Sequence, residues 1–189
     1  SFNMLFLEEI WSRNFTNLFI APLKLKEIIV SLIFTALIRT LIGLVPAIIL
    51  TSPLFGISIL ELGFPLLLLF LSLYIFGVTL GLFVSAGLIR YGPSFENIAW
   101  SSLFLLAPLG CIYYPIEILP NFFQIIAKGL PLVYIFDETR NILINGNINY
   151  ENLKQAYLLN LLYLFIGITL FYLSFLRARI KGTLINMGE

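Results

Sequence analysis

The stretch GFPLLLLFLSLYIFGVTLGLFVSAGLI, Gly63 to Ile89, decides the fold class of this chain. It contains no charged residue, and its apolar residues run continuously instead of alternating. A helix needs roughly 20 mostly apolar residues to cross the hydrocarbon core of a bilayer, which is about 30 Å thick. A membrane-spanning strand would show apolar and polar residues in alternation. The stretch therefore predicts a transmembrane helix.

The composition of the whole chain agrees with this prediction. Hydrophobic residues make up 60% and charged residues 11%, and the mean hydropathy is +1.00. A soluble domain carries about 25% charged residues. The net charge of +1 gives no basic face for nucleic acid. With no His and a single Cys, a His-based triad, a Cys/His zinc site and an internal disulfide are excluded, and we expect no metal site.

Four stretches are long and apolar enough to span: residues 28–50, 63–89, 97–116 and 155–176. They predict an all-α, polytopic bundle that forms one transmembrane domain over residues 1–189. Seven basic residues fall on one side of this arrangement and three on the other; the seven are Arg13, Lys24, Lys26, Arg90, Arg177, Arg179 and Lys181. Because basic residues are enriched in cytoplasmic loops, we expect a multi-pass protein of the cell (inner) membrane with both visible ends cytoplasmic.

Arg39 is the only charged residue in the first predicted span. Apolar residues continue from Ile28 to Leu60, so that span could begin nearer Arg39. In that arrangement the side chain would reach the interface by snorkelling. Alternatively, Arg39 faces a polar translocation path inside the membrane.

The segment 7–19 ahead of the first span has the pattern of an amphipathic helix. Its apolar residues recur at steps of three and four, and polar residues fill the opposite face. Thirteen residues or so are too few to span, so we expect this helix to lie flat at the cytoplasmic interface with Trp11 at head-group depth. Pro22 then ends or kinks it. On these grounds alone it could be a passive anchor.

The outer loop, residues 117–154, is also rich in apolar residues. Pro120, Gly129 and Pro131 divide it into pieces too short to cross a membrane. Because proline favours the first turn of a helix, we predict short helices over about 120–128 and 131–144. Apolar half-helices that cannot span re-enter the membrane where protein or a cavity shields them, so a re-entrant loop is predicted.

Two details concern packing and charge. Asp137 and Arg140 are three residues apart and can pair on one helix; together with Glu138 they form either a local salt bridge or a polar ring at an outer gate. Gly77 and Gly81 form a small-x-x-x-small pair that permits a close helix approach.

Three stretches together resemble the membrane subunit (permease) of ABC-2-type exporters, a class of ATP-binding cassette transporters with multidrug and polysaccharide members. FLEEIWSRNFTNLFIAPLKLKE, Phe6 to Glu27, is similar to that family's cytoplasmic coupling segment. APLGCIYYPIEILPNFFQIIAKGLPLVYIFDETRNIL, Ala107 to Leu143, resembles its outer loop, and RARIKGTLINMGE, Arg177 to Glu189, its basic tail. Family permeases usually have six spans. The resemblance and the initial Ser1 therefore suggest a chain without its first two spans.

The resemblance assigns roles by position. The ATPase-coupling interface would comprise Glu8, Glu9, Trp11, Arg13, Asn14, Asn17 and Pro22. The outer gate would comprise Pro120, Phe122, Phe123, Pro131, Tyr134, Asp137, Glu138 and Arg140. The sequence contains no Gly-x-x-x-x-Gly-Lys-Ser/Thr loop, so no cofactor is expected on this chain, and ATP and Mg²⁺ would bind a partner ATPase. Two permeases, as a homodimer or a pair, would enclose the path.

The spans that would enclose the translocation path are almost entirely apolar. Such a path suits an amphipathic or lipid-like cargo, such as a drug, a lipid or a lipid-linked glycan. Two alternatives belong to other classes. One is an intramembrane lipid-modifying enzyme that uses Asp137 and Glu138 beside Arg140. The other is a membrane scaffold that transports nothing.

Overall fold

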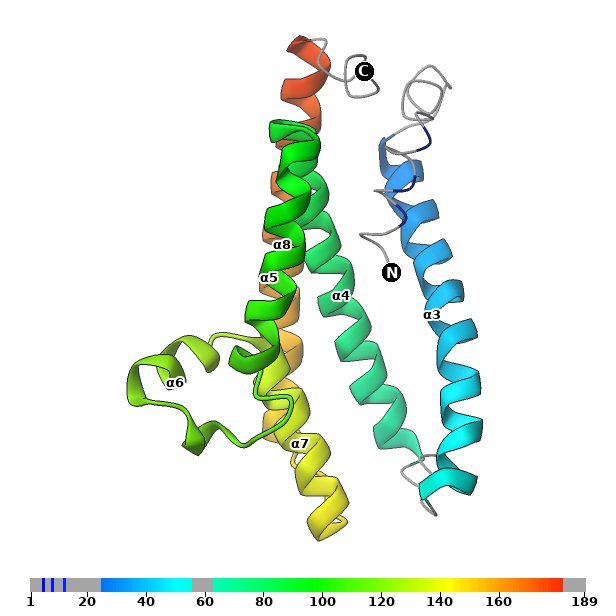
Figure 1. Ribbon diagram of the computed structural model, residues 1–189, viewed down its shortest axis with the longest axis vertical. Helices are drawn as coiled ribbons and strands as arrows, with labels where there is room; N and C mark the ends of the chain where they lie inside the picture. Colours follow the sequence, from blue (N-terminus) through cyan, green and yellow to red (C-terminus); the bar gives the residue numbers. More distant parts are fainter. Residues whose placement is uncertain (1–4, 6–7, 9–11, 13–24, 56–62, 182–189) are drawn as a thin grey trace. The chain divides into compact units, whose positions relative to one another are not determined.

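The computed structural model describes Leu5, Glu8, Ser12 and residues 25–55 and 63–181 (Figure 1). In these residues every regular element is helical, and no strand occurs. The elements are α3 (Leu25–Phe55), α4 (Phe64–Tyr91), η2 (Pro93–Phe95), α5 (Glu96–Leu109), η3 (Ile116–Ile118), α6 (Asn121–Ala127), α7 (Pro131–Asn145) and α8 (Tyr150–Lys181). The predicted all-α class is confirmed for this part of the chain.

Three of these helices contain a stretch long and apolar enough to cross a membrane: Lys26–Thr51, Phe64–Tyr91 and Tyr150–Ile180. They coincide with the first, second and fourth predicted spans. The helices extend beyond the predicted bounds, and α3 continues through Pro46. Proline is tolerated within transmembrane helices. These helices are compatible with a membrane protein.

The third predicted span, over 97–116, is wrong in its second half. α5 has 14 residues and ends at Leu109, which gives about 21 Å at 1.5 Å per residue. Gly110 donates its N–H to Leu106 O at 2.8 Å, and Cys111 then takes a left-handed φ of 54°. A left-handed residue just after the last turn is a common way to end a helix, and it stops this one although the following residues remain apolar.

The loop that follows contains two short helices close to the predicted bounds. α6 covers Asn121–Ala127, and α7 covers Pro131–Asn145, with Pro131 in its first turn. Gly146 closes α7 with a φ of 68° and donates its N–H to Ile142 O. Glycine adopts this left-handed conformation without steric cost.

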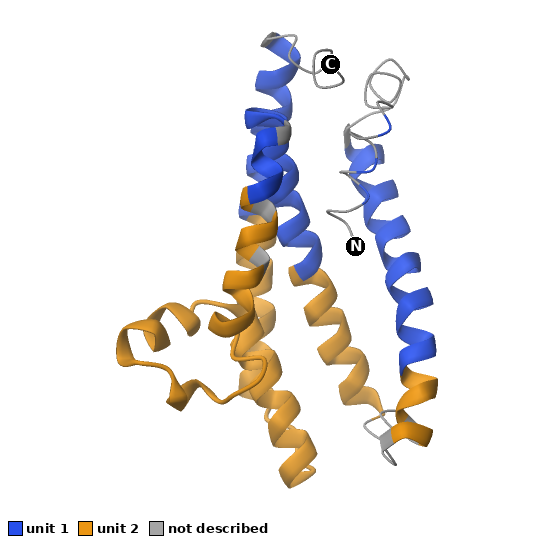
Figure 2. Cartoon of the chain, viewed as in Figure 1, with its two compact units in different colours: residues 1–47, 77–97, 166–189 blue, residues 48–76, 98–165 orange. Residues whose placement is uncertain are grey.

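The chain divides into two compact units (Figure 2). Unit 1 contains residues 1–47, 77–97 and 166–189, and unit 2 contains residues 48–76 and 98–165. In unit 2 a buried cluster joins α4, α7 and α8 through Leu69, Ile135, Leu153 and Ala156. A second cluster in unit 2 contains Cys111, Ala127 and Val133, so the single Cys is a packing residue.

Helices α4 and α8 run parallel. In unit 2 the Tyr157 hydroxyl donates to Leu68 O at 2.7 Å. The Asn160 Nδ2 donates to Ser72 O at 3.0 Å and to Ser72 Oγ at 2.8 Å. The residue numbers of the partners rise together along both helices, as they do only in a parallel pair.

In unit 1 the close approach of helices falls at a glycine that the sequence did not single out. A Cβ added at Gly167 of α8 would lie 3.5 Å from Leu82 Cβ and 3.6 Å from Thr79 O, both in α4. A Cβ added at Gly77 would meet nothing within 4 Å. Gly77 therefore makes no close helix contact among the described residues.

Candidate functional site in the loop between α5 and α8

Helix α7 lies antiparallel to the first half of α8. In the middle of α7, Glu138 contacts Asn152, close to the start of α8. Further back, Ile135 packs against Leu153 and Ala156. Just before α7 begins, Gly129 O accepts a hydrogen bond of 2.9 Å from the Tyr163 hydroxyl. Tyr163 is 13 residues beyond the first residue of α8, about 20 Å along the helix. Gly129 and α7 thus lie beside the first half of α8.

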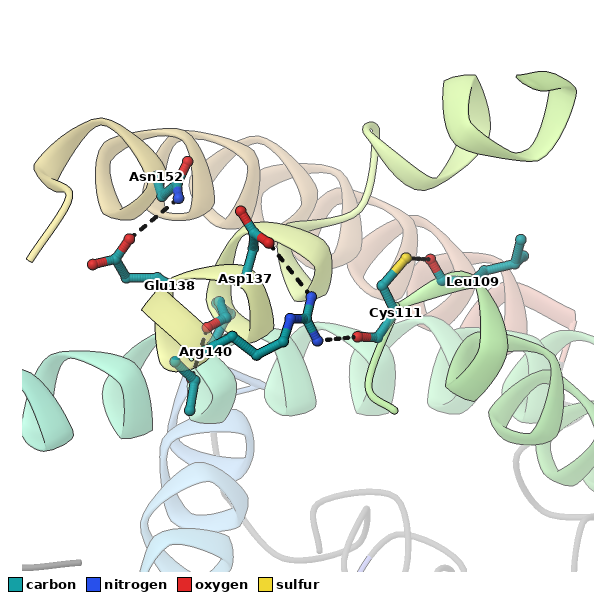
Figure 3. Close-up of polar contacts among 8 residues, drawn as sticks. Leu109, Cys111, Asp137, Glu138, Arg140 and Asn152 are labelled. Atoms are coloured by element: carbon teal, nitrogen blue, oxygen red, sulfur yellow. Dashed lines mark hydrogen bonds and ion pairs between the residues drawn. The ribbon is translucent and has the colours of Figure 1, made fainter. Parts of the chain in front are cut away.

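Glu138 faces α8 and is fully buried, with 0% of its surface exposed. Its Oε1 accepts the Asn149 backbone N–H at 2.6 Å. Its Oε2 accepts from Asn152 Nδ2 at 3.2 Å (Figure 3). Asn149 directly precedes α8. A carboxylate at a helix N-terminus binds amide groups that have no partner within the helix and interacts favourably with the helix dipole. Glu138 is therefore a cap that fixes α7 to the start of α8.

Arg140 points away from Glu138, toward the end of α5 (Figure 3). Its Nη1 donates to Cys111 O at 2.9 Å, and its Nη2 lies 3.5 Å from Asp137 Oδ1. The predicted pair of Asp137 and Arg140 is therefore present. It is partly exposed, at 26% for the Arg side chain and 48% for the Asp side chain. Arg140 thereby links α7 to the left-handed turn that ends α5.

The Pro108 carbonyl, near the end of α5, also has partners. Pro108 O accepts from the Cys111 N–H at 3.2 Å and from the Tyr114 hydroxyl at 2.8 Å. A non-helical backbone is tolerated at membrane depth only where such groups are satisfied by protein or water. Arg140 and Tyr114 satisfy the carbonyl oxygens of Cys111 and Pro108 within the chain.

The remaining residues of the predicted outer gate lie around α6 and the start of α7. Pro120 precedes α6. Phe122 and Phe123 pack edge to face at 5.6 Å between ring centroids, and both are exposed. Pro131 is buried at the start of α7, and the Tyr134 hydroxyl donates to Lys128 O at 3.1 Å. The structure brings Asp137 and Arg140 together but keeps Glu138 on the other side of α7, so these three side chains do not form one polar ring.

At the other end of the sequence, Glu8 forms an ion pair with Arg39. Arg39 Nη1 donates to both carboxylate oxygens of Glu8, at 2.9 and 2.8 Å. The Ser12 N–H donates to Glu8 O at 2.9 Å, as in a helical turn. Arg39 lies near the middle of the apolar part of α3, and the pair brings Glu8 to the same level. Six further residues of the predicted coupling interface lie outside the described residues: Glu9, Trp11, Arg13, Asn14, Asn17 and Pro22.

Several polar contacts have no counterpart in the sequence-based predictions. Asn160 and Ser72 are both fully buried and join α8 to α4. The Tyr163 hydroxyl holds the loop before α7. A lone Asn within an apolar span signals a polar contact, but its spacing does not identify the partner helix. Within the described ranges, no group of three or more His, Cys, Asp or Glu side chains could hold a metal ion.

Compared with models of protein families, with curated proteins and with solved structures, the chain matches none. The structure alone defines only a broad class of protein. In the described residues the chain is all-helical, with three helices long and apolar enough to cross a membrane.

Proposed function

We propose that this chain is the permease subunit of an ATP-driven, ABC-2-type exporter. It would move an amphipathic or lipid-like cargo out of the cytoplasm, using energy from a separate ATPase chain. The observation that carries the proposal is the fold of the outer loop. Between α5 and α8 the chain forms two short helices, α6 and α7, and α7 lies beside the first half of α8. The resemblance implies such a loop at this position.

The contacts of this loop suit a position inside the membrane. Its backbone leaves helical geometry at Cys111, and the carbonyl groups there bond to Arg140 and Tyr114. The Tyr163 hydroxyl donates a hydrogen bond to Gly129 O in the same loop. A re-entrant loop needs this internal satisfaction because lipid offers no hydrogen bonds. In an exporter, the loop would form the outer end of the path.

The parallel arrangement of α4 and α8 supports the proposed orientation. Arg90 lies in the last turn of α4, and Arg177 and Arg179 lie near the end of α8. Parallel helices end on the same side of a membrane, so these basic residues gather there. By the positive-inside rule that side is the cytoplasm. Both visible ends of the chain would then be cytoplasmic, in the cell (inner) membrane.

The ATPase would bind polar residues ahead of α3. Glu8 pairs with Arg39 midway along α3, which differs from the flat interfacial position expected for residues 7–19. The contact would therefore fall to the other predicted coupling residues, which lie outside the described residues: Glu9, Trp11, Arg13, Asn14, Asn17 and Pro22. ATP and Mg²⁺ would bind the partner, since this sequence lacks a phosphate-binding Gly-Lys-Ser/Thr loop. Two permeases and two ATPases would form a symmetric assembly. Nucleotide binding would then switch the permeases between inward- and outward-open states.

Purification of the tagged chain from its native membrane tests this proposal. We expect an ATPase with a phosphate-binding loop to co-purify, and the double variant Glu9→Gln/Arg13→Gln to lose it. The double variant Glu151→Gln/Lys154→Gln removes one acid and one base on the predicted outer side and should retain the ATPase. If the wild-type chain carries no ATPase, or if replacing the whole polar face of 7–19 leaves association and transport intact, the proposal fails.

A further inference from the structure

Arg39 stands alone in the apolar part of α3. It is the only charged residue between Glu27 and Glu61, and it lies midway along Lys26–Thr51, the part of α3 able to cross a membrane. A charged side chain at the centre of a bilayer is costly, and such residues mark binding sites and pathways by default. Its position therefore needs an explanation beyond packing.

The ion pair with Glu8 leaves much of Arg39 available. Only Nη1 donates to the carboxylate, whereas a guanidinium carries five N–H donors on three nitrogens. Among the described residues, no other acceptor binds Arg39. Its side chain is 47% exposed, and that of Glu8 is 45% exposed. The ion pair thus uses only Nη1 of the guanidinium. The N–H groups on Nη2 and Nε remain able to donate two parallel hydrogen bonds to a phosphate or carboxylate.

The surface next to Arg39 on α3 is apolar and open. Ile42, one turn further along, is 67% exposed. A Cβ added at Gly43 would meet nothing within 4 Å. A molecule with an anionic head and an apolar tail would find a cation and an apolar surface side by side here.

We propose that Arg39 is a binding site for the anionic head group of an amphiphile, a phosphate or carboxylate on an apolar chain. Glu8 occupies the guanidinium when no such molecule is bound, because its carboxylate offers the same two-oxygen acceptor. The incoming head group displaces Glu8 and gains the free donors of Arg39. The binding needs only this chain. That the bound amphiphile is the cargo rests on the exporter proposal, in which a head group must cross the level of Arg39.

The two residues of the pair have opposite effects under this proposal. Glu8→Gln removes the competing carboxylate, so the anionic amphiphile should bind several-fold more tightly. Arg39→Gln removes the charge-assisted donors and should weaken binding about tenfold or more. Arg39→Lys keeps the charge without the fork and should fall between wild type and Arg39→Gln. A purely structural ion pair would give both neutral variants the same effect.

The experiment measures the binding of labelled dodecyl phosphate to the full chain in phosphatidylcholine nanodiscs, with empty nanodiscs subtracted. Arg90→Gln and Glu151→Gln each remove one charge elsewhere and should change the Kd by less than twofold. Unlabelled dodecyl phosphate should compete with the labelled probe, whereas inorganic phosphate and the neutral dodecyl glucoside should not compete at the same concentration.

Three results would overturn the proposal. They are an unchanged Kd in Arg39→Gln, equal or weaker binding in Glu8→Gln, and full competition by inorganic phosphate, which would indicate a site for free anions. If Arg39→Gln does not fold, Glu8→Gln and Arg39→Lys still decide the matter. An exporter proposal that failed would show itself separately, as the absence of an ATPase while binding at Arg39 persisted.

Discussion

Neighbouring residues on α7 have different environments, and their expected roles differ accordingly. Asp137 is half-exposed and meets Arg140 at 3.5 Å, whereas Glu138 is buried and accepts two hydrogen bonds from the start of α8. The spacing of three residues was enough to predict the pair of Asp137 and Arg140. The partner of Arg140 on the other side, a backbone carbonyl 29 residues away, has no side-chain signature and could not be predicted.

We expect Glu138→Ala to lower the free energy of unfolding by about 2 kcal/mol, because it leaves buried donors without an acceptor. Asp137→Asn should cost less than about 1 kcal/mol, as partly exposed ion pairs do. Denaturation in mixed micelles measures both. Glu138→Gln keeps an acceptor and should recover part of the loss. The lipid-modifying enzyme alternative requires instead that Asp137→Asn and Glu138→Gln abolish turnover while stability and assembly stay unchanged.

Asn160 offers a second test at a single side chain. Asn160→Ala removes two hydrogen bonds to Ser72, whereas Ser72→Ala removes only the one to Oγ. Hydrogen bonds between transmembrane helices contribute about 0.6 kcal/mol on average. We therefore expect a coupling energy of about 0.5–1 kcal/mol in the double-mutant cycle of these two residues, measured by the same denaturation. A coupling energy of zero would mean that the side-chain bond contributes nothing.

At the scale of elements, apolar length alone predicted α3, α4 and α8, and prolines predicted the starts of α6 and α7. The end of α5 was missed because every cue there lies in the backbone. The apolar sequence continues past Leu109, yet Cys111 adopts a left-handed φ, which few non-glycine residues do. The predicted coupling residues other than Glu8 fall outside the described residues, so those assignments stay predictions.

The two glycines in α4 and α8 allow a matched test of helix packing. Gly167→Leu should lower thermal stability in detergent, because its Cβ already reaches ordinary contact distance from Leu82 and Thr79 and further atoms would clash. Gly77→Leu places the same side chain where a Cβ has no neighbour within 4 Å, and it should be tolerated. Equal loss of stability in both variants would contradict the helix contact described for unit 1.

At the scale of the whole molecule, the sequence and the described part of the structure agree on the helical class and on three of the predicted spans, while sidedness is a prediction. Single-cysteine variants test it in a Cys111→Ser background. A membrane-impermeant maleimide added to intact cells should label Asn147→Cys, beyond α7. It should reach Tyr91→Cys, at the end of α4, only after lysis. The reverse pattern would invert the proposed orientation.

The parallel course of α4 and α8 has a consequence for the lipid around the chain. If α4 and α8 both cross the membrane, as proposed, the chain between them must return across the bilayer, and α5 would make that return. Its helix covers about 21 Å of a hydrocarbon core of about 30 Å. The remaining 9 Å or so would be covered by the non-helical residues after Leu109 or by a thinner, wetter bilayer beside Cys111 and Tyr114. Local thinning of the bilayer would shorten the hydrocarbon layer that a polar head group must cross without water.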